Sequence, residues 1–280
     1  MKHNFKIKQI NKIIAVALIM FGFFLSCNTD ESQTVARFDT LVLEDNFDKD
    51  GIIDTSIWNF DVGDGTDEGI PGWGNNELQY YTDRASNVTT ENGFLLLTAR
   101  QEDFNDAQYT SARLQTKTKF QQLYGRFEAR IRLPYGQGMW PAFWLLGDDT
   151  NGLVWPQIGE IDIMENVGDE PTQIFGTVHG PGYSGAASVS KSYTLENSRV
   201  DNEFHVYGIE WGPNYINFYI DDVLYNQMTP DDVPGEWVFN DRPFYIILNI
   251  AVGGNLPGPP NLETKFPQTM LVDYVRVYQK

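Results

Sequence analysis

The sequence predicts an all-β protein, an antiparallel sandwich or barrel. Short segments in which apolar and polar residues alternate recur along the chain, and a period of two places one face of a strand against a core. Turn-forming runs such as GPNY and GGNLPGPP separate these segments. Beyond the N-terminal signal-like segment, no window of 12 or more residues repeats its apolar positions every 3.6 residues, so long amphipathic helices are not expected.

The strands are expected in the following order. FLLLTAR (94–100) is apolar almost throughout, which predicts a strand buried on both faces. In GRFEARIRL (125–133), four apolar residues alternate with four charged ones, as in a strand with one solvent-exposed face. The same pattern predicts four more strands, at residues 204–211, 215–221, 244–250 and 270–278.

The N-terminal segment, residues 1–26, resembles a bacterial lipoprotein signal peptide. Four lysines precede an apolar run of 13 residues, Ile13 to Leu25, which is short for a membrane span but suits a signal peptide. Cys27 is the only cysteine and directly follows a small residue, so we expect cleavage before it and lipidation of its thiol. An ordinary secretory signal is the alternative. We expect an exported outer-membrane lipoprotein, at the cell surface because Asp30 and Glu31 resemble a surface-export signal.

The remaining chain is expected to be a polar tether at 27–39 and a single domain at 40–280. The formal net charge is −18, and removal of the four signal lysines makes it −22. Such an acidic surface repels polyanions, which argues against nucleic acid as a partner and favours a neutral substrate. The aromatic content of 14% suggests a groove lined with rings, a surface on which sugars stack. The expected functional unit is a monomer.

The segment GEIDIMEN (159–166) gathers three carboxylates among apolar residues. Glu160 and Asp162 are two apart and share one face of a strand, whereas Glu165 would point to the opposite face if the strand were regular. A β-bulge between Asp162 and Glu165, with Met164 as the extra residue, would return Glu165 to the first face. A solvated strand edge is the alternative, but clustered carboxyls raise one another's pKa, and such clusters mark sites of chemistry.

Two carboxyls about 5–5.5 Å apart are the nucleophile and the acid/base of a retaining glycosidase. E-I-D-I-M-E resembles the bulged signature of glycoside hydrolase family 16, and specifically its laminarinase (endo-β-1,3-glucanase) branch. Further segments resemble the family in the same order: 71–83, 111–117, 125–147, 176–180, 204–211, 244–254 and 272–279. The resemblance implies a β-jelly-roll of two curved antiparallel sheets, concanavalin A-like, with a substrate cleft on the concave face.

The resemblance also implies roles for individual residues. Glu160 corresponds to the nucleophile, Asp162 to the assisting carboxylate and Glu165 to the general acid/base. The implied sugar-binding residues are Trp73, Asn75, Glu77, Tyr80, Arg113, Trp140, Trp144, His179 and Asn249. Structural roles are the alternatives for several of them. The tryptophans could be core aromatics, and Asn249, an amide in an apolar strand, could be purely structural.

No cofactor is implied for catalysis. A structural calcium ion is implied, held by Asp273, the carbonyl of Gly93 and a donor near Asn46. The expected function is retaining, endo-acting hydrolysis of laminarin-like β-1,3-glucans. A mixed-linkage β-1,3-1,4-glucanase or an agarase-like galactan hydrolase of the same family is the first alternative, and a non-catalytic glucan-binding surface lipoprotein is the second.

Overall fold

The computed structural model describes residues 37–280. The expected signal peptide, the lipidated Cys27 and most of the tether at 27–39 lie outside the described residues. Within residues 37–280, no helix has the length and apolar character needed to cross a membrane. The strand prediction is confirmed, because the described chain forms two β-sheets and only three short 3-10 helices.

The larger sheet has ten strands. Eight follow the spatial order β15 (Val223–Met228), β14 (Tyr215–Ile220), β13 (His205–Gly212), β8 (Gly125–Arg132), β17 (Gln268–Gln279), β5 (Phe94–Phe104), β6 (Ala107–Ser111) and β3 (Gln79–Tyr81). Two more extend it, β1 (Thr40–Asp45) beside β17 and β4 (Val88–Glu91) beside β5. Pairing is antiparallel except between β3 and β6, which run parallel.

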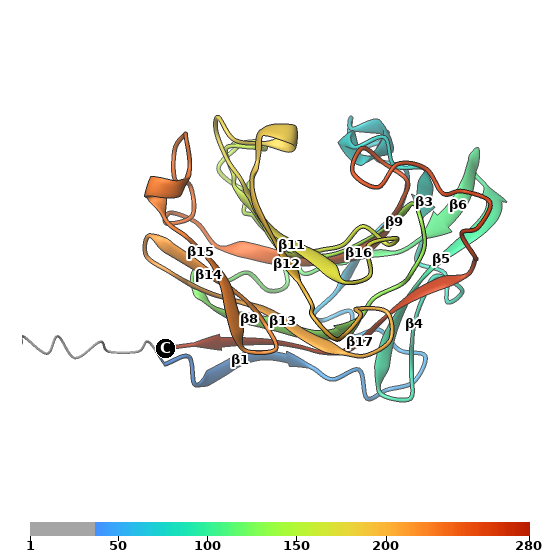
Figure 1. Ribbon diagram of the computed structural model, residues 1–280, viewed down its shortest axis with the longest axis horizontal. Coiled ribbons are helices and arrows are strands. Elements are labelled where there is room, and N and C mark those ends of the chain that lie inside the picture. Colours follow the sequence, from blue (N-terminus) through green and yellow to red (C-terminus); the bar gives the residue numbers. More distant parts are fainter. Residues whose placement is uncertain (1–36) are drawn as a thin grey trace, which may run out of the picture. The chain divides into compact units, whose positions relative to one another are not determined.

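The smaller sheet has seven strands and carries most of the candidate site. Its spatial order is β12 (Val189–Thr194), β11 (Gln173–His179), β10 (Glu160–Glu165), β9 (Met139–Gly147), β16 (Phe244–Val252), β7 (Arg113–Gln115) and β2 (Asn59–Asp61). The 3-10 helices are η1 (Pro71–Gly74), η2 (Gly185–Ala187) and η3 (Pro230–Asp232). Figure 1 shows the two sheets as stacked layers, with the loops that carry the 3-10 helices rising beyond the smaller sheet on both sides.

The core lies between the two sheets and is built from alternate residues of their strands. On β10, Ile161 and Ile163 point into it and are fully buried, and Phe143 of β9 packs in the same cluster. Phe127 and Ile131 of β8 contribute from the larger sheet. Because side chains alternate along a strand, the inward isoleucines of β10 leave its carboxylates on the outer face of the smaller sheet.

Two expectations about burial are wrong. On β5 only alternate residues such as Leu95 and Leu97 are fully buried, and the other face is half exposed. By contrast, every residue of β16, expected to have one wet face, is buried. β16 is a central strand, and side chains of the candidate site cover its outer face; Trp144, for example, bonds Asn249. The alternation of apolar and polar residues within one strand does not show that another strand will cover it.

Candidate active site

The predicted bulge in β10 is confirmed. Asp162 pairs with Trp144 of β9 and Glu165 pairs with Ala142, so three steps along β10 match two along β9. The register against β11 shifts over the same interval. The residue without a partner in β9 is Ile163, whereas Met164, which we expected to be the extra one, pairs with Phe143.

The entry to β10 is set by Gly159. Its φ of +77° lies in the left-handed region, which side chains disfavour, and a Cβ there would lie 2.9 Å from the ring of Phe244. The tight turn starts the strand at Glu160, directly opposite His179 of β11. This pairing brings a histidine from the neighbouring strand onto the carboxylate face.

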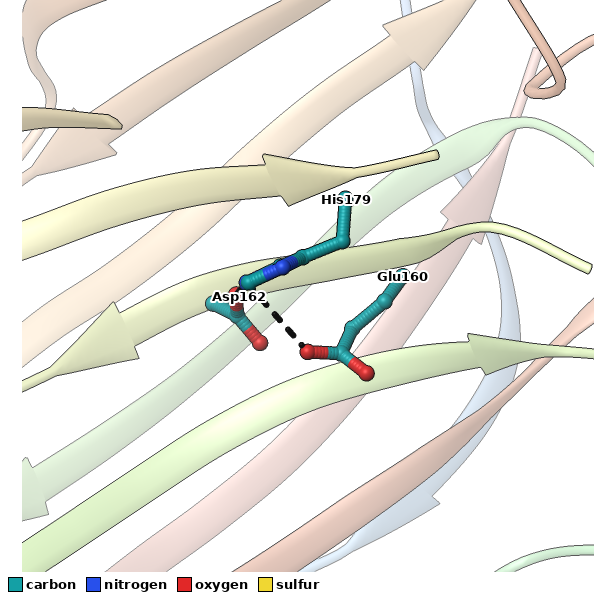
Figure 2. A group of neighbouring side chains, drawn as sticks. All are labelled: Glu160, Asp162 and His179. Atoms are coloured by element: carbon teal, nitrogen blue, oxygen red, sulfur yellow. Dashed lines mark ion pairs between the residues drawn. The ribbon is translucent and has the colours of Figure 1, made fainter. Parts of the chain in front are cut away.

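His179 joins the first two carboxylates. Its Nε2 lies 3.4 Å from Oε1 of Glu160 and 3.1 Å from Oδ2 of Asp162, and the three side chains point toward one another (Figure 2). The backbone N–H of Gly185 donates to Nδ1 at 3.1 Å, so a neutral imidazole carries its proton on Nε2, facing the carboxylates. Burial alone would lower the pKa of His179, but the hydrogen bond with Asp162 and the nearby carboxylates raise it to about 9. The Gly185 N–H opposes this rise in the pKa of His179, because its hydrogen bond requires Nδ1 to stay unprotonated.

Glu160, Asp162 and His179 are also the one group within residues 37–280 whose ligand atoms lie close enough together, within 4.8 Å, to suggest a metal. A metal on Nε2 would need the imidazole proton on Nδ1, where ligating histidines donate to an acceptor. The Gly185 N–H already donates to that atom. The group is therefore arranged for hydrogen bonding rather than for metal binding.

The three carboxyls have different surroundings. Burial raises the pKa of Glu160, and the charges of His179 and Arg113 oppose it. Burial raises the pKa of Glu165, opposed by a hydrogen bond from Nε1 of Trp140, 2.9 Å from Oε1. The pKa of Asp162 is raised well above its usual range by burial and by the charges of Glu165 and Glu160 on either side. The raised pKa favours the protonated form of Asp162. Asp162 is thus suited to hold a proton between Glu160 and Glu165, of which one would be ionised and the other protonated if they act as nucleophile and acid.

Aromatic rings and a buried cation extend the site across the smaller sheet. As expected, Trp140 and Trp144 share the carboxylate face of β9, since Trp140 reaches Glu165 and Trp144 donates to Oδ1 of Asn249 at 2.7 Å. Arg113 of β7 lies between the rings of Trp73 and Trp144, 4.5 and 4.9 Å from their centroids. A guanidinium on a ring face is a favourable contact that also fixes the ring plane.

One expected sugar-binding residue points away from this cluster. The ring of Tyr80 packs edge-on against Phe104, 5.4 Å between centroids. Its neighbour Tyr81 takes the inner position and bonds Glu77 and Asn249 through its hydroxyl. Strand alternation within QYY could have indicated that only one of the two tyrosines faces the site, but not which one.

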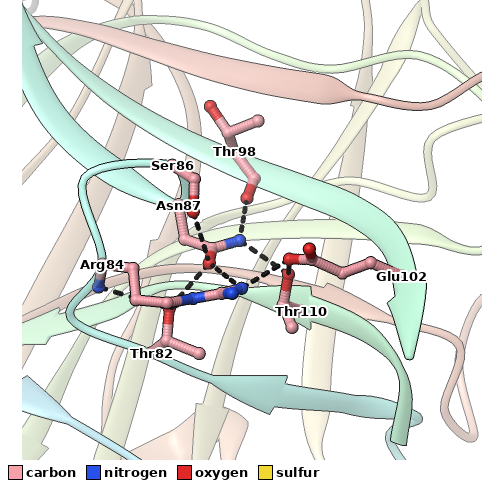
Figure 3. Close-up of polar contacts among 7 residues, drawn as sticks. All are labelled: Thr82, Arg84, Ser86, Asn87, Thr98, Glu102 and Thr110. Carbon is pink, nitrogen blue, oxygen red and sulfur yellow. Dashed lines mark hydrogen bonds and ion pairs between the residues drawn. The ribbon is translucent and has the colours of Figure 1, made fainter. Parts of the chain in front are cut away.

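A polar network holds β3 in place behind the site. The amide oxygen of Asn87 accepts from Thr82 at 2.7 Å and from Arg84 at 2.9 Å, and its nitrogen donates to the Thr98 carbonyl and the Thr110 hydroxyl (Figure 3). Arg84 and Thr110 both bond Glu102. These bonds tie the segment after β3 to β5 and β6, so the loop bearing Trp73, Asn75 and Glu77 leads into a strand whose far end is held by hydrogen bonds.

Both expected side-chain donors for calcium are paired with a guanidinium. The Asp273 carboxylate pairs with Arg130 at 2.6 Å, and the amide oxygen of Asn46 accepts from Arg276 at 3.2 Å. Gly93 forms the turn between β4 and β5 with a φ of +76°. Calcium needs several oxygens directed at one ion, and side chains that already pair with a guanidinium cation are less available as its ligands. The calcium site therefore stays a prediction.

Comparison with known proteins agrees with this geometry. The profile of glycosyl hydrolases family 16 matches residues 74–276. A β-glucanase of Rhodothermus marinus is 39% identical over 97% of this chain and 96% of its own length. The laminarinase catalytic domain of Thermotoga maritima has a TM-score of 0.82 at 47% identity, covering 86% of this chain and 98% of that one. The endo-β-1,3-glucanase of Pyrococcus furiosus has a TM-score of 0.81 at 47% identity, covering 85% and 94%.

The family match covers most of the chain, and the relatives share its two-sheet fold over nearly their full lengths. The fold is therefore the jelly-roll sandwich that the sequence implied. This chain belongs to glycosyl hydrolase family 16.

Proposed function

We propose that this protein is a retaining endo-β-1,3-glucanase that hydrolyses laminarin-like glucans. The observation that carries the proposal is the bulged strand β10, which presents Glu160, Asp162 and Glu165 on one face in three different environments. The β-1,3 linkage is supported by the similarity to a laminarinase catalytic domain and an endo-β-1,3-glucanase. No step of the mechanism requires a cofactor.

The reaction follows from the three environments. Glu160 attacks the anomeric carbon while Glu165 donates a proton to the leaving oxygen, and a covalent glycosyl-enzyme forms. Glu165, now ionised, takes a proton from water, which hydrolyses the intermediate with net retention. The Nε2 proton of His179 faces the Glu160 and Asp162 carboxylates and positions both, and Trp140 orients Glu165.

Product analysis on defined β-1,3-gluco-oligosaccharides tests this proposal. Internal cuts with retained anomeric configuration are expected, with release of reducing sugar from laminarin well above that from lichenan or agarose. Stronger release from lichenan would instead indicate a mixed-linkage β-1,3-1,4-glucanase. Strong release from agarose with none from laminarin would overturn the glucanase proposal.

The Glu160→Ala variant separates an enzyme from a glucan-binding protein. Loss of a covalent nucleophile is expected to lower kcat by about 10⁴-fold or more. Oligosaccharide binding, measured by calorimetry, should persist because the rings and Arg113 remain. Equal hydrolysis by the variant and the parent protein would refute the nucleophile assignment.

We also propose that the enzyme is exported and tethered to the outer membrane through a lipidated Cys27, acting there as a monomer. The support is the lysine-rich start, the 13-residue apolar run and the single cysteine that follows it. Incorporation of labelled fatty acid into the full chain, and its loss with release of soluble protein in Cys27→Ser, tests the anchor. Unchanged membrane attachment of the variant would exclude it.

A further inference from the structure

A one-way chain of hydrogen bonds runs through the candidate site. Nε1 of Trp144 donates to Oδ1 of Asn249 at 2.7 Å, Nδ2 of Asn249 donates to the Tyr81 hydroxyl at 3.2 Å, and that hydroxyl donates to Oε2 of Glu77 at 3.1 Å. Every donor points the same way, from β9 across β16 to β3 and its loop. Both ends of the Asn249 amide are therefore occupied within the protein.

The Glu77 end of the chain is anchored separately. Nε2 of Gln79 donates to Oε2 of Glu77 at 2.7 Å, and Oε1 of Gln79 accepts the backbone N–H of Val252 at 2.7 Å. The Leu78 N–H bonds the carbonyl of the same valine. Oε2 of Glu77 is thus held by two donors, whereas Oε1 has only a long contact of 3.5 Å from Asn75.

The middle of the chain is closed to solvent. Tyr81 is fully buried and Asn249 is 6% exposed, so neither has surface to offer a polysaccharide. Trp144 and Glu77 are both partly exposed, and they lie at the two ends. Trp144 and Glu77, which are accessible to a sugar, are therefore joined through Asn249 and Tyr81, which are not.

We propose that Tyr81 and Asn249 are positioning residues that set the indole of Trp144 and the carboxylate of Glu77 as one sugar-binding unit. The N–H bond to Asn249 fixes the indole within its plane, and Arg113, 4.9 Å from the ring centroid, fixes the orientation of that plane. The bonds from Tyr81 and Gln79 to Oε2 leave Oε1 of Glu77 to accept a sugar hydroxyl. This inference rests on the proposed function, because it names residues that shape the glucan site.

The Tyr81→Phe variant tests the proposal. It removes one hydroxyl and leaves the ring, so the chain breaks between Asn249 and Glu77. KM for a β-1,3-gluco-oligosaccharide is expected to rise about five- to tenfold, as for loss of one hydrogen bond that orients the binding groups, while kcat changes less than about twofold. Tyr207→Phe is the matched control, since Tyr207 is equally buried in the larger sheet and its hydroxyl has no partner.

Two further variants distinguish positioning from a general loss of stability. Asn249→Asp keeps the shape but offers only acceptors, so the Tyr81 proton cannot serve both carboxylates, and the same rise in KM is expected. Combining Tyr81→Phe with Trp144→Phe should raise KM by less than the product of the two separate effects, because part of the Tyr81 effect acts through the indole. Unchanged KM in Tyr81→Phe, or effects that multiply in the double variant, would overturn the proposal.

A binding measurement keeps this test independent of the hydrolytic activity. Calorimetry of laminari-oligosaccharides in a Glu160→Ala background measures the site without turnover. Weaker binding on adding Tyr81→Phe supports the proposal whatever the hydrolysis assays give. Equal binding with and without the Tyr81 hydroxyl contradicts it even if the enzyme proves to be a glucanase.

Discussion

Three carboxyls on one short strand differ in role because each meets different neighbours. Glu160 faces His179 and Arg113, whose charges favour its ionised form, whereas the indole N–H of Trp140 is the main group that favours ionised Glu165, and the charge of Glu160 opposes it. A nucleophile must be ionised and a general acid protonated at the same pH. The environments of the two glutamates therefore matter as much as their separation.

Trp140→Phe should move the alkaline limb of the pH–activity profile to higher pH. The Trp140 N–H stabilises the ionised form of Glu165, so its removal leaves burial to raise the pKa of this acid further. The profile of kcat/KM on laminarin measures the limb. Trp144→Phe is the control, because its N–H bonds Asn249 and not a carboxylate. A limb that moves to lower pH, or equally in both variants, would contradict the assigned role of Trp140.

Glu165→Gln should make the protein more stable at neutral pH while abolishing activity. Burial raises the folded-state pKa of Glu165 above its value of 4.5 in the unfolded chain. The ionised group therefore costs stability at pH values above the folded pKa, and this cost disappears as the pH falls to the unfolded value. Removing the charge should raise Tm by about 2–4 °C for each kcal/mol relieved. Calorimetric scans should show the difference at neutral pH and none below pH 4; a Tm below that of the parent protein at neutral pH would contradict it.

At the scale of strands, the spacing of residues predicted more than their hydrophobic pattern did. The extra residue between Asp162 and Glu165 correctly indicated a bulge, because three acids on one face leave few other arrangements. Alternation failed for β16, since its outer face is covered by side chains that lie far away in the sequence, such as Trp144 of β9 and Tyr81 of β3, which both bond Asn249. The expected role of Tyr80 stays a prediction, since its ring packs against Phe104, and a three-residue strand has no pattern that shows which side meets the site.

Deleting Met164 tests the bulge as an element. The shortened strand would read Glu-Ile-Asp-Ile-Glu, so two steps on β10 would match the two steps on β9 between Trp144 and Ala142, and all three acids would stay on one face. Loss of a buried methionine should lower the free energy of unfolding by about 2–5 kcal/mol. Hydrolysis should be weakened but measurable, because the acid-to-nucleophile separation changes without a change of face.

Deleting Ile161 is the matched control, since it also removes one fully buried residue from β10. It makes Glu160 and Asp162 neighbours, which a strand places on opposite faces. Urea unfolding should show similar destabilisation in the two deletions, and only the Ile161 deletion should lose all activity. Equal activity in the two would show that the face of Glu160 does not matter.

At the scale of the molecule, the jelly roll assembles the site from the whole described chain. Trp73 lies near its start and Asn249 near its end, and the intervening site residues come from β7, β9, β10 and β11. Each of these strands also packs against the core with its other face. The fold can therefore hold a long row of polar and aromatic groups on one surface without a polar core, which suits an extended polymer better than a small ligand.

The net charge of the molecule should select against anionic glucans. With a formal charge of −18 for the full sequence, or −22 once the expected signal peptide is removed, and three carboxyls within the site, the protein repels a polyanion such as carboxymethylated β-1,3-glucan. Raising the ionic strength from 0.01 M to 0.15 M shortens the screening length from about 30 Å to about 8 Å. Hydrolysis of the anionic polymer should then rise several-fold, while hydrolysis of neutral laminarin stays constant. Initial rates across a salt series measure both, and a preference for the anionic polymer at low salt would show that a local positive field, centred on Arg113, outweighs the charge of the whole molecule.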